Sequence, residues 1–248
     1  MISYKQIHWK IIILSAFFLL YSCATTKKQS LSPHIEQLIN EVNQLNCNVK
    51  SFKGIAKLKG SGFGFNLNQR IAIIASLPNQ IRVEVLGPLG SIMRIAINDQ
   101  KLYYSQRAST KIIEKKVNLW NKFLFHQKIP ILISPEELIA YMAGQIPLIK
   151  PSFADFQKEV LYIKGKSKKS QKIYFKKNSK IVKQVETFDK YGNLSYGIRI
   201  LNVKKIKDFK IPFRLEIYGK KEQNFILNYQ NYYINTPVDE SKFLLNRL

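Results

Sequence analysis

The 248-residue sequence predicts a mainly β domain of the α+β type, built as one curled antiparallel sheet. Aromatic residues make up 12% of the chain, a fraction typical of β-rich structure. Short runs of alternating polar and apolar residues follow one another, and their connections are too short for crossover helices. Two amphipathic segments carry helix-start signals, and we expect these helices to act as a lid over an apolar cavity.

The first 22 residues have the pattern of a bacterial lipoprotein signal peptide. Lys5 and Lys10 precede the ten-residue run Ile11–Leu20, which is apolar except for Ser15 and is too short to span a bilayer. The following Leu20-Tyr-Ser-Cys23 resembles the Leu-x-small-Cys lipobox, with a less usual Tyr in the second place. We therefore expect a signal peptide over residues 1–22 and lipidation, including palmitate, at Cys23.

Residues 23–31 would then be a flexible tether, and residues 32–248 the folded domain. The residue after Cys23 is Ala24 rather than Asp, which by bacterial sorting rules favours the outer membrane over the inner. The domain would face the periplasm. Cys47 is left without an intrachain partner, and its place after an apolar helical face predicts a buried structural thiol.

The first predicted helix runs over Pro33–Leu45. Ser32 suits the N-cap, Pro33 suits the first helical position, and apolar residues then recur at helical spacing. The second covers Ser134–Gly144, where Ser134 and Glu137 fit a capping box and Gly144 can end the helix. A further short helix is expected at Asn118–His126.

The strands begin with Phe52–Lys59, where lysines alternate with small and apolar residues. Further strands are expected at Gly62–Asn68, Arg70–Leu77, Ile81–Leu86, Ser91–Asn98, Lys101–Ser105, Lys111–Lys115, Val160–Lys164, Lys172–Lys177, Lys180–Phe188, Leu194–Val203, Phe213–Tyr218 and Asn224–Ile234.

The connection Gly87-Pro-Leu-Gly90 predicts a tight turn with an unusual tip. A turn tip normally lies in water, where a large aliphatic side chain such as Leu89 gains nothing. Burying that side chain would be worth about 1.5–3 kcal/mol. Leu89 therefore either folds back onto the core or is held out to touch something apolar.

The formal net charge of +24 invites anionic partners, although scattered lysines are more often solvated charge. Nucleic acid is not expected, because the chain has no aromatic recognition motif and no helix-turn-helix. Catalysis is not expected either. The three histidines have no metal-ligand spacing, and there is no Gly-x-Ser-x-Gly elbow or phosphate-binding loop. The acidic pairs Glu136/Glu137 and Asp239/Glu240 suit helix N-termini. We expect no cofactor and no metal.

Several short motifs resemble the LolB family of outer-membrane lipoprotein receptors, within the wider group of LolA- and LolB-like half-barrel lipoproteins. They are the lipobox, the first-strand Phe52-Lys-Gly-Ile-Ala, the strand-turn-strand around Val85-Leu-Gly-Pro-Leu-Gly-Ser-Ile, the helix and Gly-x-x-Pro stretch from Ile133 to Pro147, and the closing strands from Ile211. Relative to that family, the segment from about 164 to 210 is longer and richer in lysine.

The resemblance implies that the curled sheet forms an unclosed half-barrel with the helices as its lid. It also implies a monomeric receptor that accepts lipoprotein acyl chains from a periplasmic LolA-like carrier and inserts them among outer-membrane lipids. It assigns the transfer loop to Pro88, Leu89 and Gly90, with Leu89 protruding. The acyl-cavity lining would be Ala56, Leu58, Phe63, Phe65, Ile71, Ile73, Val83, Val85, Leu138 and Met142.

Two other functions remain open. One is a half-barrel lipoprotein that binds or ferries another lipid or glycolipid. The other is an envelope assembly lipoprotein whose basic segments, Lys164–Lys183 and Lys204–Lys210, contact anionic headgroups or an acidic partner.

Overall fold

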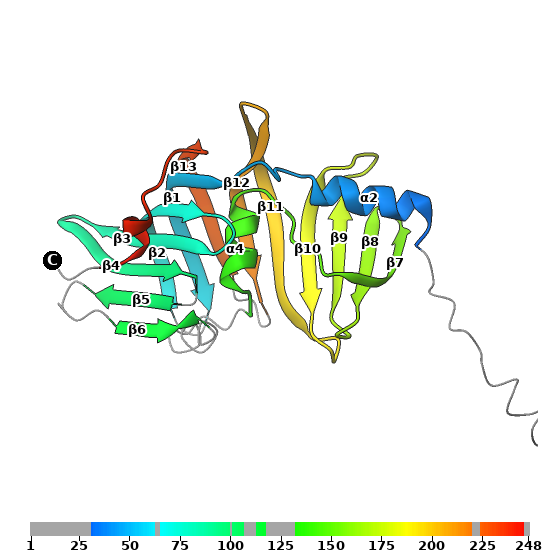
Figure 1. Ribbon diagram of the computed structural model, residues 1–248, viewed down its shortest axis with the longest axis horizontal. Coiled ribbons are helices and arrows are strands. Elements are labelled where there is room, and N and C mark those ends of the chain that lie inside the picture. The colour runs from blue at the N-terminus through cyan, green and yellow to red at the C-terminus, as the bar shows by residue number, and fades with distance from the viewer. Residues whose placement is uncertain are drawn as a thin grey trace, which may run out of the picture. The chain divides into compact units, whose positions relative to one another are not determined.

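The computed structural model describes residues 31–62, 65–99, 101–106, 113–117, 132–219 and 224–245. These residues form thirteen antiparallel strands in one sheet, with two α-helices and one 3-10 helix (Figure 1). The strand order is β6-β5-β4-β3-β2-β1-β13-β12-β11-β10-β9-β8-β7. The sheet is unclosed because β6 and β7 stand at its two ends, so the predicted mainly β half-barrel is confirmed.

The helices begin where the predicted caps lie. They are α2 (Pro33–Asn43), α4 (Pro135–Met142) and the 3-10 helix η2 (Glu240–Phe243). The strands are β1 (Ser51–Gly62), β2 (Phe65–Ser76), β3 (Gln80–Gly87), β4 (Gly90–Asn98), β5 (Lys101–Gln106), β6 (Ile113–Lys116), β7 (Pro151–Gln157), β8 (Val160–Gly165), β9 (Ser170–Phe175), β10 (Val182–Phe188), β11 (Leu194–Ile206), β12 (Phe209–Tyr218) and β13 (Asn224–Ile234).

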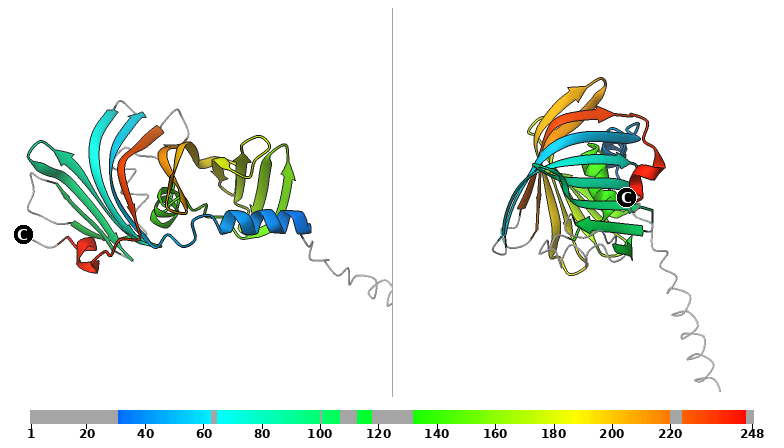
Figure 2. Two further views of the ribbon diagram at one scale, coloured as in Figure 1. Left: turned by 90° about the horizontal axis from the view of Figure 1, so that it is seen from above. Right: turned by 90° about the vertical axis from the view of Figure 1, so that its left-hand side faces the viewer.

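The two faces of the sheet follow from strand register. Gly54 of β1 lies opposite Tyr232 of β13, whose hydroxyl donates to the Met142 carbonyl of α4 at 3.1 Å. Directly opposed residues share a face, so the face that carries Gly54 and Tyr232 is covered by α4; we call it the inner face. The helix α2 lies across β7–β10 (Figure 1 and the left view of Figure 2) and buries Leu38, Ile39 and Val42.

The C-terminal segment covers part of the opposite, outer face. Ala96 and Tyr103 are register partners there and form a buried cluster with Leu245. The Arg82 guanidinium donates to the Lys242 carbonyl at 3.0 Å, and Phe243 is fully buried. Asp239 accepts from the Ser241 N–H and caps η2, as expected for this acidic pair.

The sheet is interrupted on both sides of the β11–β12 hairpin. The ladder between β10 and β11 stops at the pair Gln184–Arg199, and the ladder between β12 and β13 stops at Arg214–Asn228. Beyond these pairs, residues 200–213 pair as strands only within the β11–β12 ladder, and no third strand joins them on either side. This two-stranded segment, which we call the arm, projects past the neighbouring strands (orange in Figure 1).

Several strand predictions were wrong in detail. The two strands expected at 62–68 and 70–77 are one strand, β2. The strand β7 was missed because Pro151 resembles a break, yet Pro is tolerated at the first residue of an edge strand. The strand β12 begins at Phe209 rather than Phe213, with Pro212 inside it. The helix predicted at Asn118–His126 lies outside the described residues.

Candidate functional site

The inner face of β1–β3 carries six of the ten predicted cavity-lining residues: Ala56, Leu58, Ile71, Ile73, Val83 and Val85. Register pairs Ala56 with Ile71 and Ile71 with Val85, while Ile73 pairs with Val83. All share the face of Gly54. Most are buried, whereas Leu58 and Val83 are half-buried, as are Met93 and Ile95 on the next strand. A continuous apolar surface therefore runs across these strands, and part of it remains accessible.

The helix α4 is seated by specific polar contacts. The Ser134 hydroxyl accepts from the Glu137 N–H at 3.2 Å, and the Glu137 carboxylate accepts from the Ser134 N–H at 3.0 Å, which confirms the predicted capping box. The other Glu137 oxygen accepts from the Tyr196 hydroxyl of β11 at 2.9 Å. One carboxylate thus caps α4 and attaches it to the sheet.

The far end of α4 is held by a glycine in the left-handed conformation. Gly144 has φ +76°, and the Gln145 N–H donates to the Ala140 carbonyl at 2.9 Å, as in a Schellman motif. The two predicted cavity-lining residues of α4 differ in exposure, since Met142 is buried and Leu138 is half-buried. The contacts that fix α4 are made with β11, β12 and β13, on one side of the β1–β3 surface.

Buried tyrosines surround the place where α4 contacts the sheet. Tyr141 and Tyr196 meet edge to face with ring centroids 6.2 Å apart, and Tyr232 stacks on Phe52 at 5.1 Å. Four of these tyrosines have a pKa far above the ordinary value near 10, and burial of the hydroxyl is the largest cause in each case. They are Tyr141, Tyr196, Tyr229 and Tyr232.

High pH should therefore destabilise the domain. In the unfolded chain these tyrosines ionise from about pH 10, whereas the folded state keeps their protons. The free energy of unfolding keeps its full value below pH 10. Above pH 10 it falls by at most about 1.4 kcal/mol per pH unit for each buried tyrosine. Urea unfolding at pH 9, 10 and 11 measures this; equal unfolding free energies at all three would contradict it.

Asn46 joins three segments that are distant in sequence. Its side-chain amide donates to the carbonyls of Ala143, Gly144 and Lys210 at 2.8–3.2 Å, and its oxygen accepts from the Lys210 N–H at 3.3 Å. At Lys210, the edge of β12 that faces away from β11 pairs with no strand. The Asn46 amide therefore supplies the two hydrogen bonds that a neighbouring strand would make.

No sequence motif indicated that the Asn46 side chain would connect distant segments. Its φ of +51° is a conformation that Asn tolerates better than most residues, and it follows a helix end, where such a residue is common. That local signal is weak. The contacts with 143–144 and 210 come only from the fold.

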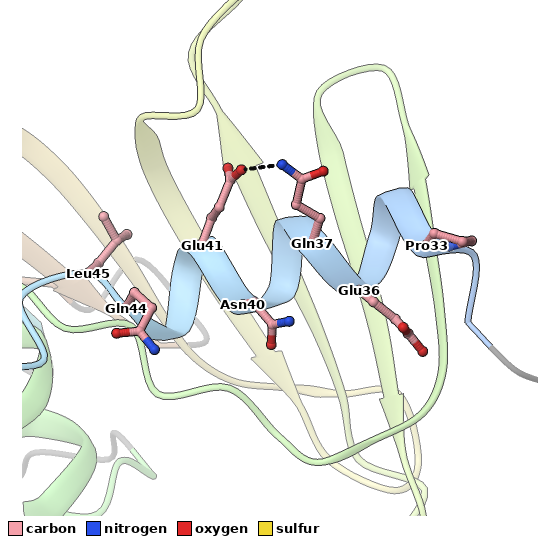
Figure 3. A pocket seen from close by; sticks show the side chains of 7 residues that line it. All are labelled: Pro33, Glu36, Gln37, Asn40, Glu41, Gln44 and Leu45. Carbon is pink, nitrogen blue, oxygen red and sulfur yellow. Dashed lines mark hydrogen bonds between the residues drawn. The ribbon is translucent and has the colours of Figure 1, made fainter.

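Two hollows adjoin α2. One, of about 70 Å³, is lined by residues that include Leu45, Ile146 and Ile200, and is well below the 300–1,000 Å³ of ordinary ligand sites. The other, of about 700 Å³, runs along the polar side chains of α2 (Figure 3). There Gln37 donates to Glu41 at 3.0 Å, and Lys180 pairs with the same carboxylate at 2.6 Å. The hollow is shallow and open and carries the Glu36 and Glu41 carboxylates, so it does not give an acyl chain continuous apolar shelter.

The predicted transfer turn lies between β3 and β4. Gly90 has φ +106°, and Leu89 is 79% exposed, so its side chain is held out and not folded onto the core. Pro88 and Gly90 are exposed as well. The role of the turn in transfer stays a prediction.

Three other predicted residues are placed less fully or not at all. Cys23 and Phe63 lie outside the described residues, and Phe65 opens β2. The expectation of a buried thiol at Cys47 was wrong. Cys47 is half-exposed, in the turns after α2, and its Sγ lies 3.3 Å from the Gln44 amide oxygen.

In the described part of the chain, no cluster of three His, Cys, Asp or Glu could hold a metal ion. None of the helices described is long and apolar enough to cross a membrane.

Comparison with known proteins identifies the fold. No family model and no curated protein sequence matches the chain. Among solved structures, a LolA superfamily protein from Nitrosomonas europaea is 11% identical, with a TM-score of 0.57 over 86% of this chain and 99% of its own. A DUF1329 family protein from Desulfovibrio piger is 10% identical, with a TM-score of 0.61 over 85% and 96%.

A domain from Vibrio parahaemolyticus named for outer-membrane lipoprotein sorting is 12% identical, with a TM-score of 0.56 over 85% of this chain and 94% of its own. The chain therefore has the fold of LolA-like half-barrels. At these identities the likeness is one of fold.

Proposed function

We propose that this protein is a lipid-anchored envelope lipoprotein that accepts lipoprotein acyl chains from a periplasmic carrier and inserts them into the outer membrane, without catalysis. The observation that carries the proposal is the pairing of two features. An apolar inner face on β1–β4 keeps half-buried side chains, and a turn at the end of β3 holds Leu89 in solvent. The LolA-like fold and the lipobox at Cys23 support the same role.

The physics of this role needs only apolar shelter. Each acyl methylene moved into water costs about 0.8 kcal/mol, so a lipoprotein in transit needs a continuous apolar surface. Val83, Met93 and Ile95 offer such a surface with no charged group among them. Burial of this kind is non-directional and would accept any saturated chain.

Replacing Leu89 by Glu should stop transfer while leaving the fold intact. The side chain is exposed, so a carboxylate there costs the domain little, but a charge opposes entry into a bilayer. The assay follows an acylated lipoprotein from its carrier into vesicles bearing the variant, and we expect at least a ten-fold slower transfer. Tyr191→Glu is the matched control, because Tyr191 is 76% exposed on another turn. Equal transfer rates for the two variants would rule out the role of Leu89.

The same uncharged face also fits a carrier of free lipid or glycolipid. Mass spectrometry of lipids retained after detergent-free purification separates these candidates. Stoichiometric retained lipid that falls in a Val83→Asp variant favours the carrier of free lipid. A lipid-free protein that still passes on lipoproteins favours the acceptor.

A further inference from the structure

The arm, residues 200–213, carries an unusual combination of exposed side chains. Leu201 is 42% exposed and Val203 is 38% exposed. Beside them, Lys204, Lys205, Lys207 and Lys210 are exposed, and Asp208 is the one acidic residue of the segment. Aliphatic and cationic groups therefore share one two-stranded projection.

The positive charge of the arm is not neutralised by the rest of the described chain. Among the described residues, no carboxylate lies within 4.0 Å of an arm lysine, whereas Lys101, Lys180 and Arg199 each have one. The Lys204 ammonium instead lies 4.2 Å from the centre of the Phe213 ring. The cationic groups thus remain available to an anionic partner.

Edge protection alone does not explain this composition. Lysines on an unpaired strand do discourage edge-to-edge association. However, the same purpose gives no reason to expose Leu201 and Val203. The turn at Lys166–Lys169 is comparably basic but contains no aliphatic side chain.

We propose that the arm docks on the surface of an anionic phospholipid bilayer. Lysine ammonium groups would meet the headgroup phosphates, while Leu201 and Val203 enter the interface between headgroups and acyl chains. A protein partner fits less well, because lysine is depleted at protein–protein interfaces and the exposed centre of the arm holds no Arg, Trp or Tyr. This inference is independent of lipid transfer, since it uses neither Leu89 nor the inner face.

Two features fix the arm for this purpose. The Asn46 amide bonds both backbone groups of Lys210, and Phe213 at the base meets the Tyr229 ring at 6.1 Å. An isolated two-stranded hairpin is marginally stable in water, so these contacts keep the arm ordered. Its tip turns at Lys207, which has φ +53°.

The test uses the full lipoprotein in vesicles, with a fluorophore on Asn202→Cys in a Cys47→Ser background. Signal from the same background without the new cysteine is subtracted. A nitroxide-bearing lipid reports contact by quenching. The vesicles are phosphatidylcholine alone or phosphatidylcholine with 30% phosphatidylglycerol, and a label at Tyr191→Cys, before the start of β11, controls for general proximity.

We expect quenching of the arm label in the anionic vesicles only, weakened by 0.5 M salt. Each lysine near such a surface is worth about a five-fold change in contact, so losing two lysines costs about 25-fold. Lys204→Glu with Lys205→Glu also adds two repelled charges and should lower contact by at least that factor. Lys166→Glu with Lys168→Glu changes the same charge and should have little effect. Equal quenching on neutral vesicles, no quenching on anionic ones, or equal losses in the two double variants would overturn the proposal.

Discussion

Replacing Gly54 by alanine is expected to destabilise the domain by about 3 kcal/mol, which is a large effect for one methyl group. A Cβ at this position would lie 2.5 Å from the Asn231 carbonyl oxygen and 3.3 Å from the Tyr229 ring. The obstacle is strand backbone and cannot swing away. Relief would require β1 and β13 to separate at the middle of the sheet, where the Tyr232 and Phe52 rings stack.

The matched control is Gly165→Ala. Gly165 is also a buried strand glycine without a positive φ, but its Cβ would find its nearest neighbour at 3.5 Å, an ordinary contact. We expect this variant to be neutral or slightly stabilising, because alanine lowers the entropy of the unfolded chain. Urea unfolding followed by circular dichroism measures both. Similar midpoints for the two variants would show that β13 yields at Gly54.

Replacing Asn46 by alanine should cost at least about 3 kcal/mol. The change removes four hydrogen bonds to the carbonyls and N–H of residues 143, 144 and 210, each worth about 0.5–1.5 kcal/mol. It also leaves alanine at φ +51°, which costs a further 1 kcal/mol or so. The free energy of unfolding and the exchange protection of the Lys210 amide should both fall.

Two variants separate these contributions. Asn178→Ala places alanine at φ +53° in an exposed turn, so it should show the backbone cost alone. Asn46→Gly accepts the left-handed conformation, so it should show the loss of hydrogen bonds together with only the small entropic cost of a glycine in the unfolded chain. If Asn46→Ala were no worse than Asn178→Ala, the Asn46 amide would contribute nothing to stability.

Local signals were sufficient for the helices and the sequence of hairpins. Ser32-Pro33 and the Ser134–Glu137 box fixed both helix starts, because a cap is formed by neighbouring residues. The meander followed from alternation and short connections. Two strand predictions were wrong at prolines: β7 was missed and β12 was started after Pro212. The sequence alone does not show which strands stand at an edge, where proline is tolerated.

The arrangement of the site depended on distant pairings. The sequence placed Ala56, Ile73 and Val85 on one face, since alternation and register are nearly local. It did not reveal that α4 sits against Tyr196 and Tyr232, or that Asn46 bonds to Lys210. The arm was also hidden, because it exists only where the ladders on both of its sides stop.

The place of β13 has a consequence for how the chain folds. Strands β1–β6 and β7–β12 are two runs of sequential hairpins, and β13 alone pairs with both β1 and β12. Each run can form from local contacts, but the sheet becomes continuous only when β13 is present. We therefore expect slow folding that ends with insertion of the last strand. A nascent chain would stay incompletely folded until β13 has been synthesised.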